Sequence, residues 1–275
     1  MVSAKILQKH HSYHSVKKSD FTRAEYVVRV EIVERFFRKF PALITPVQVL
    51  MTLSLYAQCS LMIGTAAFPS VYLIYHYWQE SQTWGLGLRL FVLSLIGAGG
   101  YFLYAIALIF VVASGCFVFR LKIKEGRYYL YSSPAIKWAV YNSLILIVRY
   151  TCMNFLRATP FLNLFYRMMG AKIGKNVQIN TCIIGDCALL EIGDHTIIGG
   201  DVTLVAHVSE HNELIVKKVR IGSNVTVGIM SIIMPGVEIG DRVMIAANSV
   251  ISKNTKIPSD SVWGGIPARQ ITSQK

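Results

Sequence analysis

The sequence predicts a chain of two unlike halves: an α-helical N-terminal half with two transmembrane helices, and a mostly β C-terminal half that forms a left-handed parallel β-helix. Two observations predict the first half: only 16% of the residues are charged, and no charge occurs between Lys39 and Glu80 or between Arg89 and Arg120. The third observation is a six-residue repeat of aliphatic side chains that begins at Ile173.

The positive charge is concentrated beside the apolar stretches. The net charge of the 275 residues is +13, of which +5 falls in 1–40 and +9 in 120–175. The segment 41–119 carries one basic and one acidic residue, and 176–275 has a net charge of −1. This distribution indicates contact with membrane headgroups, and it gives no support to nucleic acid as a partner.

The two charge-free stretches each exceed the about 20 apolar residues that cross a hydrocarbon core. We expect the first span at about 47–68, with a kink or break after it at Pro69, and the second at about 90–118. The linker 79–87 contains one acidic residue, whereas both outer flanks are rich in Lys and Arg. The positive-inside rule therefore predicts a multi-pass protein of the cytoplasmic (inner) membrane, with its N- and C-terminal parts facing the cytoplasm.

The segments that flank the hairpin have amphipathic patterns. Segment 20–40 alternates apolar and charged residues at helical spacing, which predicts a helix on the membrane surface or a helix packed on the soluble domain. A surface helix is also expected over 134–156, because Lys137 and Arg149 leave only eleven uncharged residues between them. Four domains are predicted: 1–40 basic N-terminal segment with an amphipathic interfacial helix, 41–120 transmembrane hairpin, 121–170 basic linker and interfacial helices, and 171–275 β-helix.

The repeat gives the C-terminal half its fold. Aliphatic residues recur at a spacing of six, with a small residue usually next and Val, Thr or Ser four positions later. The aliphatic positions are Ile173, Ile179, Ile192, Ile198, Leu204, Ile221, Val227, Ile233, Ile239, Ile245, Ile251 and Ile257. Each unit forms one short strand and one turn, so three units close a triangular coil. About five coils are expected over 173–261.

Five cysteines (Cys59, Cys116, Cys152, Cys182 and Cys187) form no CxxC pair. They are expected to be small buried apolar side chains in a reducing compartment. A disulfide framework is therefore not predicted.

Three segments resemble the hexapeptide-repeat acyltransferases, with a pattern similar to the galactoside and maltose O-acetyltransferases. They are FLNLFYRMMGAKIG before the repeat, LVAHVSEHNELIVKKVRIG within it and MIAANSVISKNTKIPSDSVWGGIPARQI at its end. The first also resembles membrane-anchored members of this superfamily, including the terminal domain of some peptide synthetases. The resemblance covers 161–272, and it implies acetyl-CoA or another acyl-CoA as donor and a homotrimer with its active site between subunits.

The repeat is interrupted between Leu204 and Ile221, where polar residues include His207 and His211. Interruptions of a regular solenoid often carry function. The resemblance implies that His207 is the general base that takes the proton of the acceptor, a task that suits imidazole at neutral pH. His211 either contacts the substrate or orients the ring, or is a solvated loop residue. Backbone N–H groups at coil turns would stabilise the oxyanion.

The resemblance also implies a coenzyme A site along the later coils. Small residues at Gly228 and Ala247 would permit close approach, and Lys253 and Arg269 would face the phosphates; the alternative for both cations is a solvated surface. The chain departs from the sugar acetyltransferases at Thr226, where Trp is usual, and at Ile229, where Ser is common.

The predicted function is a membrane-anchored acyltransferase, most simply an O- or N-acetyltransferase. Its acceptor is expected to be a hydroxyl or amine of a membrane-associated molecule, such as a glycolipid or a lipid-linked saccharide, because a soluble sugar would not require an enzyme held at the bilayer. Two alternatives remain: a non-catalytic trimeric membrane scaffold, and a zinc hydratase of the carbonic anhydrase type with His195, His207 and His211 as ligands. The leading prediction includes no metal.

Overall fold

The computed structural model describes residues 42, 44–130 and 132–271. The amphipathic helix predicted over 20–40 lies outside these residues. Contacts divide the chain into two units, 1–49 and 50–275. Of the first unit, the described part is mainly the first turn of one long helix, and all the features below belong to the second unit.

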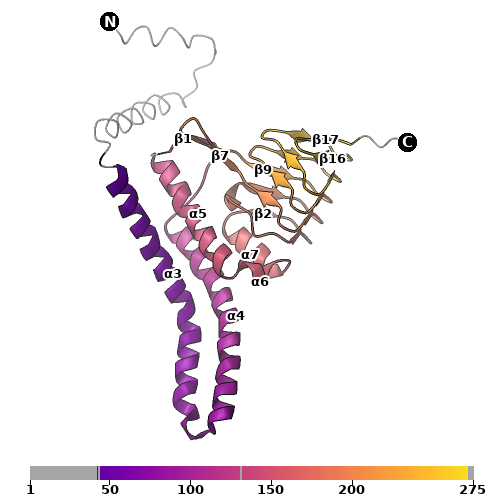
Figure 1. Ribbon diagram of the computed structural model, residues 1–275. Coiled ribbons are helices and arrows are strands. Elements are labelled where there is room, and N and C mark those ends of the chain that lie inside the picture. The colour runs from indigo at the N-terminus through magenta and orange to yellow at the C-terminus, as the bar shows by residue number, and fades with distance from the viewer. Residues whose placement is uncertain (1–41, 43, 131, 272–275) are drawn as a thin grey trace. The chain divides into compact units, whose positions relative to one another are not determined.

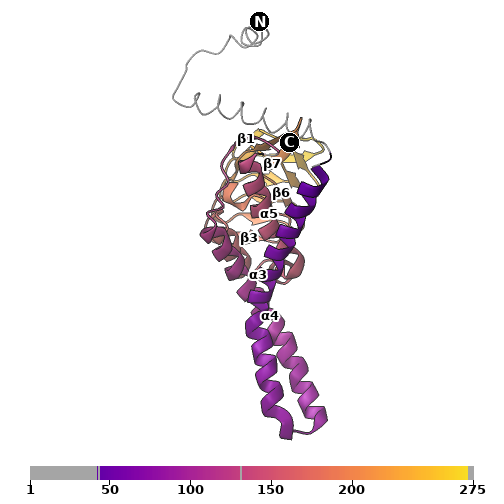
Figure 2. The ribbon, with the colours of Figure 1, turned by 90° about the vertical axis from the view of Figure 1, so that its left-hand side faces the viewer.

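Two long helices form the start of the second unit. Helix α3 (Ile44–Glu80) leads through a short 3-10 turn η3 (Ser81–Thr83) into helix α4 (Leu86–Val118). Segments 45–83 and 86–118 are both long and apolar enough to cross a membrane, with mean hydropathies of 1.4 and 2.3. Below the start of α3, the two helices run side by side to their turn (Figures 1 and 2).

A kink or a break was predicted at Pro69; helix α3 continues through this residue, so it does not break there. Proline removes one backbone hydrogen bond from a helix, a loss that packing can offset. Here the next residue, Ser70, donates its hydroxyl to the carbonyl oxygen of Gly100 on α4 at 2.6 Å. The small Gly100 lets the two helices approach closely at this point, because an added Cβ would lie 3.2 Å from that of Ser70.

The C-terminal half is a parallel β-helix with three sheets (Figure 1). The first has the order β15-β12-β9-β4-β2, the second β17-β16-β13-β10-β5-β3 and the third β14-β11-β6. The bounds of these strands are β2 Lys172–Ile173, β3 Gln178–Ile179, β4 Leu190–Ile192, β5 Ile197–Ile198, β6 Thr203–Leu204, β9 Val219–Ile221, β10 Thr226–Val227, β11 Ile232–Ile233, β12 Glu238–Ile239, β13 Met244–Ile245, β14 Val250–Ile251, β15 Lys256–Ile257, β16 Val262–Gly265 and β17 Ala268–Gln270. Only β17 pairs antiparallel among these strands.

The aliphatic repeat forms the interior of the coils, as predicted. All its positions from Ile179 to Ile257 are buried, and Ile173 in the first coil is half-buried. The turns share a second regularity, since the third residue after each aliphatic position often has a positive φ. Asn176, Asn224 and Asn254 are examples, and Asn tolerates this left-handed conformation better than most residues.

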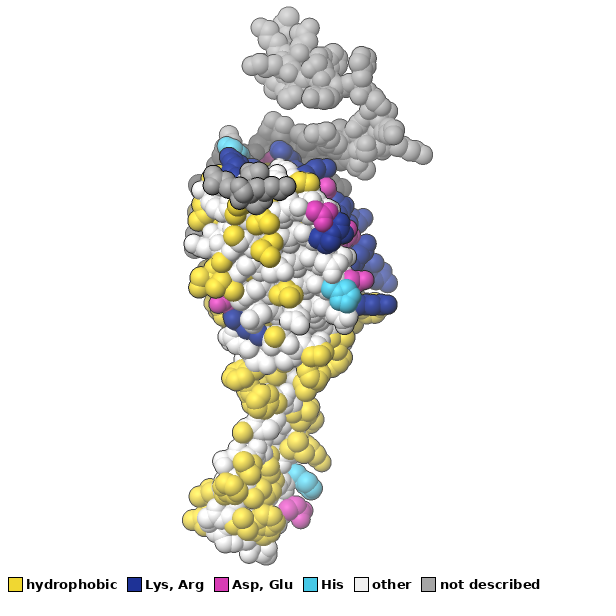
Figure 3. Space-filling view, turned by 90° about the vertical axis from the view of Figure 1, so that its right-hand side faces the viewer, with side chains coloured by type: hydrophobic (Ala, Val, Ile, Leu, Met, Phe, Trp, Pro, Cys, Tyr) yellow, Lys and Arg dark blue, Asp and Glu magenta, His cyan; other side chains and the backbone are white. Residues whose placement is uncertain are grey.

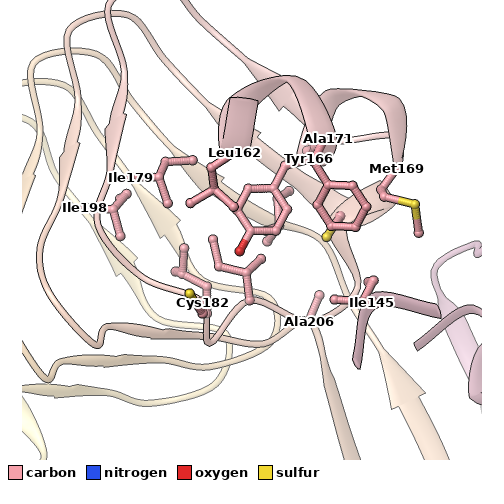
Figure 4. Close-up of a cluster of buried hydrophobic side chains, with 14 of the residues drawn as sticks. Ile145, Leu162, Tyr166, Met169, Ala171, Ile179, Cys182, Ile198 and Ala206 are labelled. Carbon is pink, nitrogen blue, oxygen red and sulfur yellow. The ribbon is translucent and has the colours of Figure 1, made fainter. Parts of the chain in front are cut away.

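Three helices close the end of the β-helix nearest α4: α5 (Ser133–Thr151), α6 (Met153–Leu156) and α7 (Pro160–Met168). Figure 4 shows Leu162 and Tyr166 of α7 beside Ile179 and Ile198 of the coils. Helix α5 is also part of this core, because Tyr141 and five other residues of it are buried. The predicted surface location of 134–156 is therefore corrected: the apolar face of α5 packs against protein.

A small antiparallel sheet joins the linker to the interruption of the repeat. Strand β1 (Gly126–Tyr129) pairs with β8 (Glu213–Val216), and β8 pairs with β7 (His207–Glu210). The polar interruption is thus an ordered hairpin that is held by residues far away in sequence. No strand was predicted in the part of the linker before α5, where the structure has β1.

Candidate functional site

His207 lies at the first residue of β7, directly after the second coil of the β-helix. It faces Val216 across the hairpin. The hairpin turns at His211 and Asn212, which have positive φ values of 50° and 64°. Hairpins with two such residues match the twist of their strands, so the local sequence explains why the interruption folds back on itself.

The imidazole of His207 is paired with a buried carboxylate. Nδ1 of His207 lies 2.6 Å from Oδ2 of Asp186, whose side chain has no exposed surface, whereas 29% of the His207 side chain is exposed. An ionised carboxylate only accepts hydrogen bonds, so Nδ1 carries the proton. The lone pair of the ring is then on Nε2, which is the arrangement that a general base requires.

Three further groups hold the Asp186 carboxylate. Oδ1 accepts from Nε1–H of Trp138 at 2.6 Å and from Nδ2–H of Asn142 at 3.0 Å. Oδ2 accepts from the backbone N–H of Ala206 at 3.1 Å. Because each hydrogen bond favours the ionised form, the buried charge is well compensated.

The pKa of Asp186 reflects these contacts. Burial is the largest single effect and acts to raise the pKa, but the hydrogen bond and charge of His207, with hydrogen bonds from Asn142 and Trp138, lower it below its ordinary value. The carboxylate is therefore ionised at neutral pH. It can orient His207 and stabilise the imidazolium that forms when Nε2 takes a proton.

Helix α5 contributes both side chains that hold Asp186. The ring of Trp138 also meets the His207 ring edge to face, with centroids 4.7 Å apart. Asn142 forms a reciprocal pair with Asp186, since its Oδ1 accepts the backbone N–H of Asp186 at 3.2 Å. The helical half of the chain thus supplies part of the candidate site within the same subunit.

The other two histidines of the repeat lie elsewhere. His211 is exposed at the tip of the hairpin. His195 occupies a coil turn with a φ of 55°, and its backbone N–H donates to the carbonyl oxygen of Lys175. Within the described ranges, no three His, Cys, Asp or Glu side chains come close enough to hold a metal ion. The arrangement therefore does not favour the zinc hydratase alternative.

The four residues predicted to bind coenzyme A lie at three places. Gly228 and Ala247 stack at one corner of neighbouring coils, where a Cβ on Gly228 would come within 2.5 Å of the Ala247 backbone nitrogen. Lys253 lies beside the hairpin and forms an ion pair with Glu210. Arg269 is exposed on β17, at the far end of the second sheet.

Sequence reasoning found His207 but missed Asp186, Trp138 and Asn142. A signal for Asp186 exists, because Ile179 and Ile192 are separated by thirteen positions instead of twelve, which marks an earlier interruption of the repeat. The neighbouring Cys187 is not a nucleophile candidate. It is completely buried, and burial raises the pKa of its thiol far above neutral pH.

Comparisons with known proteins agree with the fold and the repeat. Residues 218–253 match the profile of the bacterial transferase hexapeptide family (six repeats). The putative acetyltransferase YvoF of Bacillus subtilis is 31% identical over 148 residues, which cover 50% of this chain and 85% of YvoF. The chain therefore belongs to the hexapeptide-repeat acetyltransferases, an enzyme family of acyl-CoA-dependent transferases, and its β-helix is the left-handed form that the repeat predicts.

Two further relatives are matched over smaller parts of their length. The galactoside O-acetyltransferase of Escherichia coli is 36% identical over 107 residues, which cover 36% of this chain and 52% of that enzyme. The delta-poly-L-ornithine synthetase of Acinetobacter baumannii is 29% identical over 163 residues, which cover 56% of this chain but only 12% of the synthetase. The first of these matches confirms the predicted similarity to the galactoside O-acetyltransferases.

A protein of another class is also similar to this chain. Gamma carbonic anhydrase 2 of Arabidopsis thaliana is 36% identical over 129 residues, which cover 38% of this chain and 45% of that protein. In this chain, Nδ1 of His207 is directed to Asp186.

Proposed function

We propose that this protein is a membrane-anchored acyltransferase that moves an acyl group, most simply acetyl, from acyl-CoA to a hydroxyl or amine of a membrane-associated acceptor. The observation that carries the proposal is the Asp186–His207 pair, at 2.6 Å, in the hairpin that interrupts the repeat. A scaffold would not require a buried carboxylate that fixes one tautomer of a half-exposed histidine.

The reaction uses His207 twice. Its Nε2 takes the proton of the acceptor as the acceptor oxygen or nitrogen attacks the thioester carbonyl carbon. The C–S bond then breaks, and the same proton passes from Nε2 to the departing sulfur, so that coenzyme A leaves as a thiol. Asp186 stays ionised throughout and stabilises the imidazolium between the two transfers.

Trp138 and Asn142 are positioning residues in this account. Their hydrogen bonds fix the plane of the Asp186 carboxylate, and the Trp138 ring also limits the tilt of the imidazole. Groups that hold the partner of a histidine in place also fix the orientation of the imidazole that exchanges protons. His211, at the hairpin tip, remains a candidate substrate contact.

The donor is assigned by family membership together with the residues of the later coils. Exposed Ala247 and Arg269 fit a cofactor with an extended backbone and phosphates, because the first permits close approach and the second provides a guanidinium. Lys253 is already paired with Glu210, so its charge is neutralised and less available to the phosphates of the cofactor. Bound acyl-CoA would supply the activated thioester.

Membrane attachment is supported by the surfaces of α3 and α4. Large apolar side chains are exposed along both helices, among them Leu61, Phe68 and Phe91, each more than 60% exposed. Soluble proteins rarely expose apolar surface on this scale. Figure 3 shows this apolar surface on the helices below the β-helix. An acceptor at the bilayer, such as a glycolipid or lipid-linked saccharide, explains why the enzyme would be anchored there.

A homotrimer is the assembly that fits this family, with six transmembrane helices in total. The β-helix exposes apolar side chains that association could cover, including Ile229, Met230 and Met244. We expect native mass analysis in detergent to give three copies, and a monomer would contradict this part of the proposal.

The purified protein should release thiol from acetyl-CoA or a long-chain acyl-CoA when an extract of membrane lipids and lipid-linked glycans is added. The acceptor should gain the mass of the acyl group. His207→Ala should lower this release by about 100-fold or more, while the control His195→Ala should keep it. Absence of extract-dependent release with both donors would favour the scaffold.

A further inference from the structure

A cavity of about 750 Å³ lies where helix α4 ends, and its lining residues do not include those of the candidate catalytic site. Phe117 and Val118 of α4 line it together with the segment 120–124. Residues 168–170 and Ala188 also line it. It combines an apolar wall with cations, and none of its lining residues takes part in the proposed acyl transfer.

The end of α4 is fixed by its own backbone hydrogen bonds. The N–H of Leu121 donates to the carbonyl oxygen of Cys116, and the N–H of Arg120 donates to that of Phe117, both at 3.1 Å. This pair of bonds is a Schellman motif, and its left-handed residue is Arg120, with a φ of 49°. A cation is therefore held directly after the last turn of an apolar helix.

The next residues alternate in exposure. Leu121 and Ile123 are half-buried and pack on the core, whereas Lys122 and Lys124 are exposed. Together with Arg120, three cations therefore line one side of the cavity. All three cations are exposed.

The charge of these cations is not balanced by acidic residues of the cavity. Neither Asp nor Glu occurs among its lining residues. The adjacent Glu125 is directed elsewhere, since its carboxylate accepts the backbone N–H of Lys218 at 2.9 Å. In the part of the chain that the structure describes, no ion pair involves Arg120, Lys122 or Lys124. The cavity is thus complementary to an anion.

The apolar side of the cavity continues along α4. Phe117 and Val118 are 85% and 69% exposed, although they are part of a helix that is long and apolar enough to cross a membrane. A ligand that satisfies both sides has an anionic head beside the cations and an apolar tail beside the helix. This is the chemistry of an anionic phospholipid at a membrane interface.

We propose that this cavity binds the headgroup of an anionic phospholipid, with the acyl chains lying along the last turns of α4. The inference rests on the proposed membrane attachment and is independent of the acyltransferase chemistry. A lipid held between α4 and the residues around Met169 would fix the depth of the β-helix at the membrane surface.

The test compares lipid retention by full-length protein reconstituted in nanodiscs of phosphatidylcholine with phosphatidylglycerol. The protein is then released from the nanodiscs, and native mass spectrometry counts the phosphatidylglycerol molecules that stay bound to it. The triple variant Arg120→Gln, Lys122→Gln, Lys124→Gln should retain at least about tenfold less phosphatidylglycerol than the unmodified protein. The reason is that each basic residue contributes measurably to anionic lipid binding.

The control carries the same loss of charge on the β-helix, Lys172→Gln, Lys175→Gln, Lys256→Gln, and should retain as much as the unmodified protein. Equal retention of phosphatidylglycerol and phosphatidylcholine, or an equal loss in the control, would overturn the proposal. So would displacement of the lipid by millimolar inorganic phosphate, which would show a phosphate site that needs no acyl chain. His207→Ala should retain the lipid. A failure of the acyltransferase proposal is therefore distinguishable from a failure of the lipid-site proposal.

Discussion

At the scale of single residues, the site is a histidine whose partners come from two other segments, helix α5 and the turn at Asp186. His207 was predictable because it falls in a break of a strict repeat and matches a family motif. Asp186, Trp138 and Asn142 were not, since they precede His207 by 21, 69 and 65 positions and only the folded chain brings them together. A sequence pattern of period six carries no information about contacts between an α-helix and a coil.

Asn142 should contribute to stability as well as to position. We expect Asn142→Ala to lower the free energy of unfolding by about 2 kcal/mol, because a buried carboxylate loses one of its hydrogen bonds. Denaturant unfolding in detergent measures this loss. The adjacent Ser143→Ala is the control, since Ser143 bonds only within its own helix and should change the stability little. Equal effects of the two substitutions would contradict the role of Asn142.

The pH dependence of stability should reveal the charge on Asp186. Its pKa is lower in the folded than in the unfolded chain, so its interactions stabilise the fold above the unfolded pKa of about 3.9. This stabilisation is lost as the pH falls through the folded pKa. We therefore expect the difference in unfolding free energy between the unmodified protein and Asp186→Asn to be smaller below about pH 4 than at pH 7. A difference independent of pH would contradict an ionised Asp186.

At the scale of elements, the coil strands were predictable and the pairing of β1 with the hairpin was not. Aliphatic spacing directly reports which side chains face the interior of a coil. The interruption has no such period, so its β7–β8 pairing and the addition of β1 depend on tertiary contacts. Helix α5 was assigned to the membrane surface because an amphipathic face looks the same whether it meets lipid or protein.

The close stacking of coils can be tested at a glycine. A Cβ on Gly193 would lie 2.6 Å from the backbone of Gly222 and Ser223 in the next coil. We expect Gly193→Ala to destabilise the fold by about 1–3 kcal/mol, as overpacking does. In Gly97→Ala, the added methyl group meets no atom within 4 Å, so this helical control should be neutral or stabilising. Thermal unfolding of both variants measures the contrast.

At the scale of the whole molecule, the helical hairpin and the β-helix were both predictable, because length and hydropathy report the first and the repeat reports the second. The proposed topology places both ends of the hairpin in the cytoplasm. We expect a cysteine introduced at Thr83, exposed at the hairpin turn, to react with an impermeant thiol reagent in intact cells. One introduced at Lys175 should react only after the membrane is opened, and the reverse pattern would contradict the topology.

The central claim is that the Asp186–His207 pair performs acyl transfer, and one measurement tests it most directly. The rate of coenzyme A release with membrane extract should fall by about 100-fold or more in Asp186→Asn, because the amide no longer fixes the proton on Nδ1. The variant should remain folded, as judged by thermal unfolding at neutral pH. A folded Asp186→Asn protein with the unmodified rate would contradict the account.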